Sequence, residues 1–115
     1  MEWYPFFPLK YRAETRHLSF AEHGVYRLLI DEYMMTERPL PDDDRALARI
    51  IGATPKEWSR VAMAVRAFFV PDNGVLHHKE CDEQLADQKQ RSETARRSAR
   101  LRWNGSGRGI SDADA

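Results

Sequence analysis

Basic side chains cluster towards the C-terminal end of the sequence, and this positive charge is the clearest functional signal in the chain. Residues 86–108 carry seven Lys or Arg against two acidic side chains, a local net charge of +5. Residues 1–85 carry 11 basic and 14 acidic side chains, so the whole chain has a formal net charge of zero. Clustered cations are typical of a surface that neutralises phosphates, and we therefore expect residues 89–102 to bind nucleic acid.

Five of these cations are the predicted phosphate contacts: Lys89, Arg96, Arg97, Arg100 and Arg102. Neutralising about five phosphates would give duplex binding a steep salt dependence, with a slope near −0.9 for each phosphate. The alternative interpretation is a solvated basic helix, or a stalk that binds a protein partner.

A second set of candidate contacts lies on a predicted helix that begins at residue 55. Its outward face carries Lys56, Ser59 and Arg60, and Arg66 lies on the flank. If this is the second helix of a helix-turn-helix, it enters the major groove, where Lys56 and Arg60 reach base edges or phosphates. An ordinary solvated helix face is the alternative, because two cations form only a thin basic surface.

The sequence predicts no catalytic residue, metal site or cofactor. His77, His78 and Cys81 lie close together, but no second Cys or distant His pair completes a zinc-ligand pattern. His17 and His23 beside Glu14 and Glu22 resemble acid–base groups only superficially. Capping and packing explain Glu22, and His23 is expected to be a core or interface histidine. Since there is also no phosphate loop, nucleophile with a positioned base, or spaced carboxylate pair, we expect a protein that is not an enzyme.

The elements that must position these residues begin with an aromatic, Pro-broken segment over residues 3–8, which predicts an extended segment or an edge strand. A helix is predicted from Ser19, where Ser19 and Glu22 form a capping box, and Pro39 and Pro41 end it. We expect Gly24 to permit a close helix crossing. The predicted buried stripe of this helix consists of Val25, Leu28, Leu29 and Tyr33, widened by Tyr26 and Ile30.

A helix-turn-helix is predicted next. Its first helix covers 42–51, with the acidic run Asp42-Asp43-Asp44 at the positive end of the dipole and Gly52 as the C-terminal glycine. Thr54, Pro55 and Glu57 then predict the start of a third helix. The predicted buried side of that helix is Trp58, Val61, Ala62, Val65, Phe68 and Phe69.

A hairpin follows, because short strand-like runs at 69–70 and 75–77 flank Pro71-Asp72-Asn73-Gly74, a strong turn sequence without Lys or Arg. A long helix is expected from about Lys79 to Trp103, where no Pro or Gly occurs. The predicted fold class is mainly α with a small β-hairpin: a winged helix-turn-helix followed by a long C-terminal helix. We expect a winged-helix-like domain over 1–80, a long basic helix over 81–104 and a disordered tail over 105–115.

A seam of mostly small residues runs along the last helix: Leu85, Ser92, Ala95, Ala99 and Trp103. Two copies of this helix can pair through it, and a dimer would present two recognition helices to a two-fold DNA site. The seam is too weakly apolar for a coiled-coil assignment, so the sequence permits either a monomer or a homodimer.

Several stretches at matched spacing resemble the YdaU-like family of phage and prophage replication-associated proteins. They are the segment 3–8, His17-Leu18-Ser19 with 22–29, the run 39–44, the helix up to Gly52, Trp58, Phe68-Phe69, Leu76-His77 and Arg102-Trp103. Lys10 departs from the acidic residue usual there. The resemblance covers about residues 2–104 and implies a winged-helix-like N-terminal module, a replication-initiation or helicase-loading context, and DNA as the ligand.

The resemblance also implies that many relatives have a separate C-terminal part. We expect the function of that part to be absent from this chain or to be supplied by another protein. The expected partners are DNA and a replicative helicase or other replication protein. The alternative is a protein–protein interaction module, or a phage-encoded inhibitor that docks on a host or replication protein. The zero net charge argues against mimicry of DNA by the whole chain.

Composition favours a cytoplasmic protein. A single cysteine, Cys81, rules out an internal disulfide framework. No apolar run approaches the roughly 18 residues that span a bilayer, and the N-terminus lacks a signal-peptide pattern, so no membrane association is expected.

Overall fold

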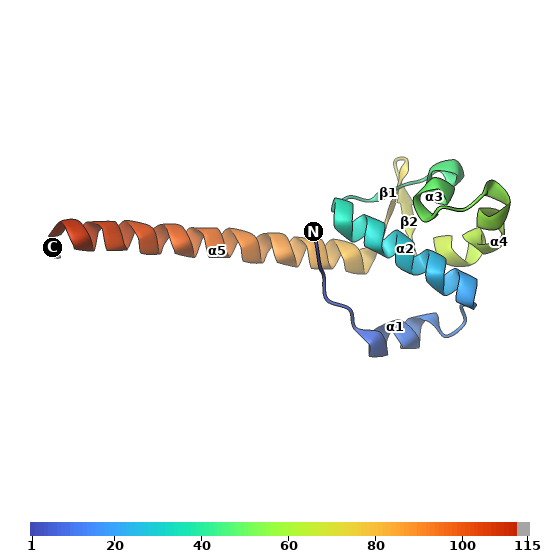
Figure 1. The fold of residues 1–115 in the computed structure, drawn as a ribbon, viewed down its shortest axis with the longest axis horizontal. Helices are drawn as coiled ribbons and strands as arrows, with labels where there is room; N and C mark the ends of the chain where they lie inside the picture. Colours follow the sequence, from blue (N-terminus) through green and yellow to red (C-terminus); the bar gives the residue numbers. More distant parts are fainter. Residues whose placement is uncertain (113–115) are drawn as a thin grey trace. The chain divides into compact units, whose positions relative to one another are not determined.

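The structure is a computed structural model that describes the backbone of residues 1–112 and the side chains of residues 1–104. Five helices and a three-stranded sheet make up this part of the chain (Figure 1). In chain order the elements are α1 (Pro8–Thr15), α2 (Phe20–Thr36), β1 (Leu40–Pro41), α3 (Asp44–Ile51), α4 (Pro55–Arg66), β2 (Val70–Asp72), β3 (Val75–His77) and α5 (Lys79–Asp112). The predicted fold class of a mainly helical chain with a hairpin and a long last helix is confirmed at this level.

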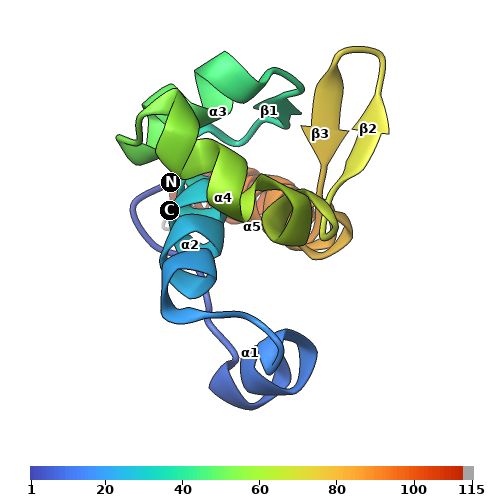
Figure 2. The same cartoon turned by 90° about the vertical axis from the view of Figure 1, so that its right-hand side faces the viewer.

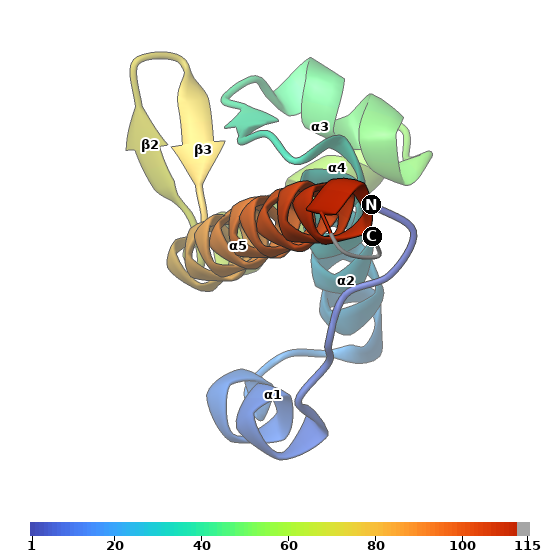
Figure 3. The same cartoon turned by 90° about the vertical axis from the view of Figure 1, so that its left-hand side faces the viewer.

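The chain divides into two compact units, Met1–Asp82 and Glu83–Ala115. In the first unit α2, α3 and α4 pack against one another (Figure 2). Figures 2 and 3 both show α1 on the opposite side of α2 from α3 and the strands. The second unit contains the rest of α5. Among the described residues, no helix is apolar over a stretch long enough to cross a membrane.

The core of the first unit joins the three packed helices to the sheet. Tyr33 of α2, Leu47 of α3 and Val65 of α4 are fully buried, and Trp58 is only 2% exposed. Burying such side chains contributes about 1.5–3 kcal/mol each, and this burial positions the outer face of α4. The predicted buried side of α4 is therefore confirmed at Trp58, Val61 and Val65.

Helix ends follow the local signals in the sequence. Ser19 with Glu22 and Thr54 with Glu57 form the two predicted capping boxes. The Asp43 side chain accepts from the Ala46 N–H at 3.0 Å, which confirms the capping role of the acidic run. Gly52 adopts φ 73°, the left-handed conformation expected after α3.

The predicted hairpin is present and gains a third strand. Asn73 and Gly74 have φ of 50° and 84°, as a tight two-residue turn between β2 and β3 requires. Strand β1 pairs antiparallel with β3, with Leu40 opposite Leu76, and gives the order β1-β3-β2. Both leucines are buried, so the sheet is anchored to the core from its β1–β3 side.

Several predicted details are wrong. Leu28 is 49% exposed, whereas Met34, which was not predicted, is buried on α2. The space around a Cβ at Gly24 is empty to 4 Å, so no close crossing occurs there. Helix α4 ends at Arg66, before the predicted residues 68–69, and α1 was not predicted.

Helix α5 continues beyond its predicted end. The backbone of residues 105–112 is helical, within the segment that we expected to be disordered. The remainder of that predicted tail, residues 113–115, lies outside the described residues.

Candidate nucleic-acid interface

The exposed face of α4 carries three of the predicted contacts. Lys56, Ser59 and Arg60 are all exposed, and Met63, one turn beyond, is 88% exposed. The Ser59 hydroxyl donates to the Lys56 carbonyl oxygen at 2.7 Å, which leaves its oxygen lone pairs as acceptors. The two amino-terminal turns of α4 thus present two cations and a hydroxyl to solvent, as predicted from their spacing.

Arg66 differs from these residues because its guanidinium is bound within the fold. Its Nη1 lies 2.7 Å from Asp42 Oδ1, and its Nε and Nη2 lie 3.0 and 2.9 Å from Asp44 Oδ1. Trp58 Nε1 also donates to Asp44 Oδ1, at 2.8 Å. These bonds from Trp58 and Arg66 lower the pKa of Asp44. Arg66 therefore ties the end of α4 to the start of α3.

The basic side chains of α5 are exposed, as predicted: Lys89, Arg96, Arg97, Arg100 and Arg102. Arg96 is 3.4 Å from the Ser92 hydroxyl, and Arg91 pairs with Asp87 at 3.1 Å. Within the described part of the chain, none of the five makes an ion pair with an acidic group. Lys89, Arg96 and Arg100 share one helix face over about 16 Å, at 1.5 Å per residue.

Sequence reasoning missed two further pairs of exposed arginines. Arg45 and Arg49 lie one turn apart on α3, and Arg12 and Arg16 lie one turn apart at the end of α1. The spacing of four residues was visible in the sequence. For Arg12 and Arg16 the spacing alone did not predict a shared face, because no helix was predicted there.

His78 and Cys81 belong to a buried polar cluster that explains both residues structurally. His78 Nε2 is 2.7 Å from the Tyr26 hydroxyl, and Nδ1 accepts from the Cys81 N–H at 3.2 Å, so His78 caps α5. Burial lowers the pKa of His78 and raises the pKa of the Cys81 thiol to about 12. The two hydrogen bonds engage both ring nitrogens of His78. The raised pKa keeps the Cys81 thiol protonated at neutral pH.

His77 completes a second set of bonds at the same helix start. Its Nδ1 lies 3.0 Å from Asp82 Oδ2, and the Tyr33 hydroxyl donates to the other oxygen of Asp82. Tyr33 also accepts from the His78 N–H at 3.1 Å. Across the residues that the structure describes, no group of three or more His, Cys, Asp or Glu is arranged to hold a metal ion.

Comparison with known proteins gives two matches. A family model described as "Protein of unknown function (DUF1376)" matches residues 2–86. The uncharacterized protein YdaU of Escherichia coli (strain K12) is 35% identical over 81 residues, which cover 70% of this chain and 28% of that protein. This chain thus corresponds to less than a third of its relative's length. No solved structure matches it. Because the family model spans most of the sequence, the chain belongs to the DUF1376 family, which agrees with its resemblance to YdaU.

Proposed function

We propose that this chain is a DNA-binding module of phage or prophage replication and that it catalyses no reaction. Five exposed cations of α5, none of which makes an ion pair with a described acidic group, carry the proposal: Lys89, Arg96, Arg97, Arg100 and Arg102. Unpaired cations at helical spacing attract a polyanion and release its counterions on binding. The exposed Lys56 and Arg60 of α4 add a second basic surface.

The order of elements in the first unit supports a winged-helix interpretation. A helix, α2, and a short strand, β1, precede the tightly joined pair α3 and α4, and the β2–β3 hairpin follows. In this interpretation α4 is the recognition helix and the hairpin is the wing. The β2–β3 hairpin carries Asp72 and no Lys or Arg, so we assign it no phosphate contact.

The replication context rests on the resemblance to the YdaU-like family. We place the module at initiation or helicase loading, with a replicative helicase or another replication protein as its partner. The chain spans only 28% of YdaU, so the activity and partners of that whole protein enter here only as part of the proposal.

Fluorescence anisotropy with labelled duplex and single-stranded DNA tests the proposal. The triple variant Arg96→Ala/Arg97→Ala/Arg100→Ala removes three cations, and Gln88→Ala/Gln90→Ala/Ser98→Ala changes as many exposed positions of α5 without altering charge. We expect wild type and the control to bind equally and the charge variant to bind at least tenfold more weakly. Absence of binding by wild type at low ionic strength contradicts the proposal.

A second candidate function is protein–protein interaction, and the N-terminal segment favours it. Trp3 is 74% exposed, Phe7 56% and Leu9 87%, within seven residues of one another. Clustered exposed apolar side chains mark protein interaction sites. Tyr4 anchors this segment to α2, because its hydroxyl bonds to Asp31 and accepts from Arg27 Nη2 at 2.8 Å.

Affinity capture from host lysate after nuclease treatment tests this candidate. A partner that wild type retains and that Trp3→Ala/Phe7→Ala loses would support it, with the α5 charge variant as the control that leaves capture unchanged. Capture that nuclease abolishes would contradict it and favour DNA as the link.

A further inference from the structure

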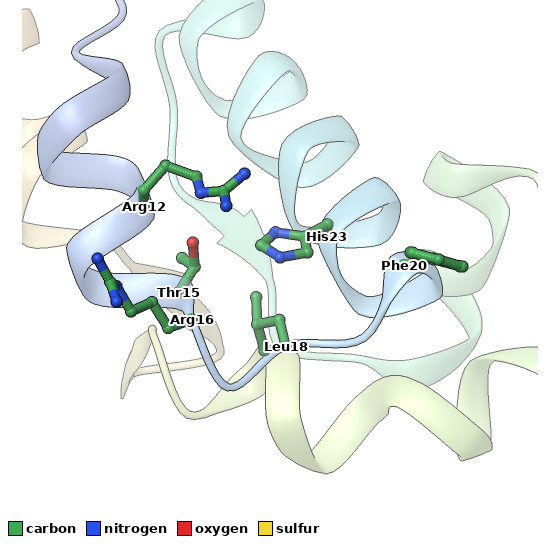
Figure 4. A pocket seen from close by; sticks show the side chains of 6 residues that line it. All are labelled: Arg12, Thr15, Arg16, Leu18, Phe20 and His23. Carbon is green, nitrogen blue, oxygen red and sulfur yellow. The ribbon is translucent and has the colours of Figure 1, made fainter.

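An open hollow of about 620 Å³ lies in the first unit, where the end of α1 approaches the start of α2 (Figure 4). Its lining consists of Arg12, Thr15, Arg16, Leu18, Phe20 and His23. Leu18 and Thr15 are buried and form the floor, so the polar groups available to a ligand are those of the arginines and the histidine.

The charge of this hollow is positive. Arg12 lies in the last turn of α1 and Arg16 directly follows its end, and neither makes an ion pair with any residue that the structure describes. Figure 4 shows the Arg12 guanidinium extending towards His23, whereas Arg16 points towards the outer side of α1. The nearest acidic residue along α2, Glu22, is engaged in the capping box, where Oε1 accepts from the Ser19 N–H at 2.8 Å.

His23 is held in place on the α2 wall. Its Nδ1 lies 2.8 Å from the Tyr11 hydroxyl, and burial raises the pKa of Tyr11, so the phenol keeps its proton at neutral pH. When that phenol donates to Nδ1, the neutral imidazole carries its own proton on Nε2 and can donate it. Arg12 and His23 then supply donors from two different helices.

We propose that this hollow binds a phosphate group, with Arg12 and His23 as direct donors and Arg16 as a second cation at its rim. Guanidinium groups match the oxygen pairs of a phosphate, and donors from separate walls suit a tetrahedral anion better than a planar carboxylate. The phosphate belongs either to a free nucleotide or to a DNA strand. This site does not depend on the proposed DNA-binding surfaces of α4 and α5.

NMR of the His23 ring in the full chain tests the site, with inorganic phosphate as the probe and acetate at matched ionic strength as the carboxylate control. We expect a saturable shift of the ring signals with phosphate and none with acetate. Titration with dAMP, and with a short single strand with or without a 5′-phosphate, distinguishes the sources: a stronger response to dAMP indicates a nucleotide site, and a stronger response to the phosphorylated strand indicates a DNA end.

A variant of Arg12 tests whether its guanidinium binds the phosphate. Loss of a charge-assisted hydrogen bond in Arg12→Ala should weaken phosphate binding about tenfold. Arg49→Ala, which removes another exposed arginine, on α3, should bind as wild type does. An unsaturable response, an equal response to acetate, or an unchanged affinity in Arg12→Ala would overturn the proposal.

Discussion

Arg66 shows how a surface cation can be used inside a fold. Its guanidinium contacts Asp42 and Asp44 at 2.7–3.0 Å and is only 29% exposed. Predicting such a role requires knowing that residues 42–44 and 66 meet, and their separation in sequence hides it. The helical spacing predicted which face of α4 carries Arg66, but it did not predict that Arg66 would contact Asp42 and Asp44.

The substitution Arg66→Ala should therefore act on stability and not on DNA binding. It leaves two carboxylates without their cation and should lower the free energy of unfolding by about 1 kcal/mol. Urea denaturation measures that change, and DNA affinity by anisotropy should stay within twofold of wild type. Weaker DNA binding at unchanged stability would instead place Arg66 in the interface.

A substitution at Gly24 should raise the free energy of unfolding, whereas the substitution at Arg66 should lower it. Gly24 lies in an early turn of α2, where an added Cβ would meet nothing within 4 Å. Gly24→Ala should stabilise the protein by about 0.5–1 kcal/mol, because Ala loses less backbone entropy in a helix. Thermal denaturation followed by circular dichroism measures this gain. A lower midpoint would reveal a contact that requires glycine.

His78 should make stability depend on pH. Burial outweighs the opposing influence of Glu80 and Asp82, while Lys10 adds to the lowering, so the folded pKa of His78 lies below its ordinary value of 6.5. Between these two values the unfolded chain binds more protons than the folded one, so the free energy of unfolding decreases as pH falls below 6.5.

The variant His78→Asn isolates this contribution, because Asn can still cap α5 but does not titrate. Urea denaturation at about pH 7.5 and about pH 5 should show a smaller acid-induced loss in the variant than in wild type. The variant should also be less stable at the higher pH, since it lacks the bond to Tyr26. Equal acid-induced losses would mean that His78 does not contribute.

At the scale of elements, one face of α4 packs into the core and the opposite face carries the proposed DNA contacts. Trp58 and Val65 are buried, whereas Lys56 and Arg60 are exposed. Lys56→Ala/Arg60→Ala should weaken DNA binding several-fold and change the free energy of unfolding by no more than about 0.5 kcal/mol. The control Arg38→Ala/Lys79→Ala removes the same charge elsewhere on the surface. If both variants weaken binding equally, α4 contributes only through net charge.

Local signals predicted the elements that they control. The capping boxes at Ser19 and Thr54 and the left-handed Gly52 depend only on residues within a few positions, so the sequence sufficed. The turn at Asn73-Gly74 belongs to the same class.

Elements that depend on distant partners were missed. Strand β1 exists through its pairing with β3, more than 30 residues away, and two residues alone carry no strand signal. Helix α1 has only a weak apolar stripe and is attached through Tyr11, which bonds to His23 and stacks on Tyr26. Missing α1 also hid Arg12 and Arg16 from the set of candidate binding residues.

At the scale of the whole molecule, zero net charge conceals a separation of charge along the chain. Residues 1–85 carry three more acidic than basic side chains, whereas 86–108 carry five more basic ones. The Debye length is about 8 Å at physiological salt, so a bound strand responds to the local charge and not to the total. A formally neutral protein can therefore bind DNA strongly through one segment.

The salt dependence of duplex binding by the intact chain tests this account most directly. If about five α5 cations neutralise phosphates, a plot of log affinity against log salt concentration should have a slope near −4.5, and Arg96→Ala/Arg97→Ala/Arg100→Ala should reduce it to about −2. A slope near zero, or one that this variant leaves unchanged, would contradict DNA binding through α5.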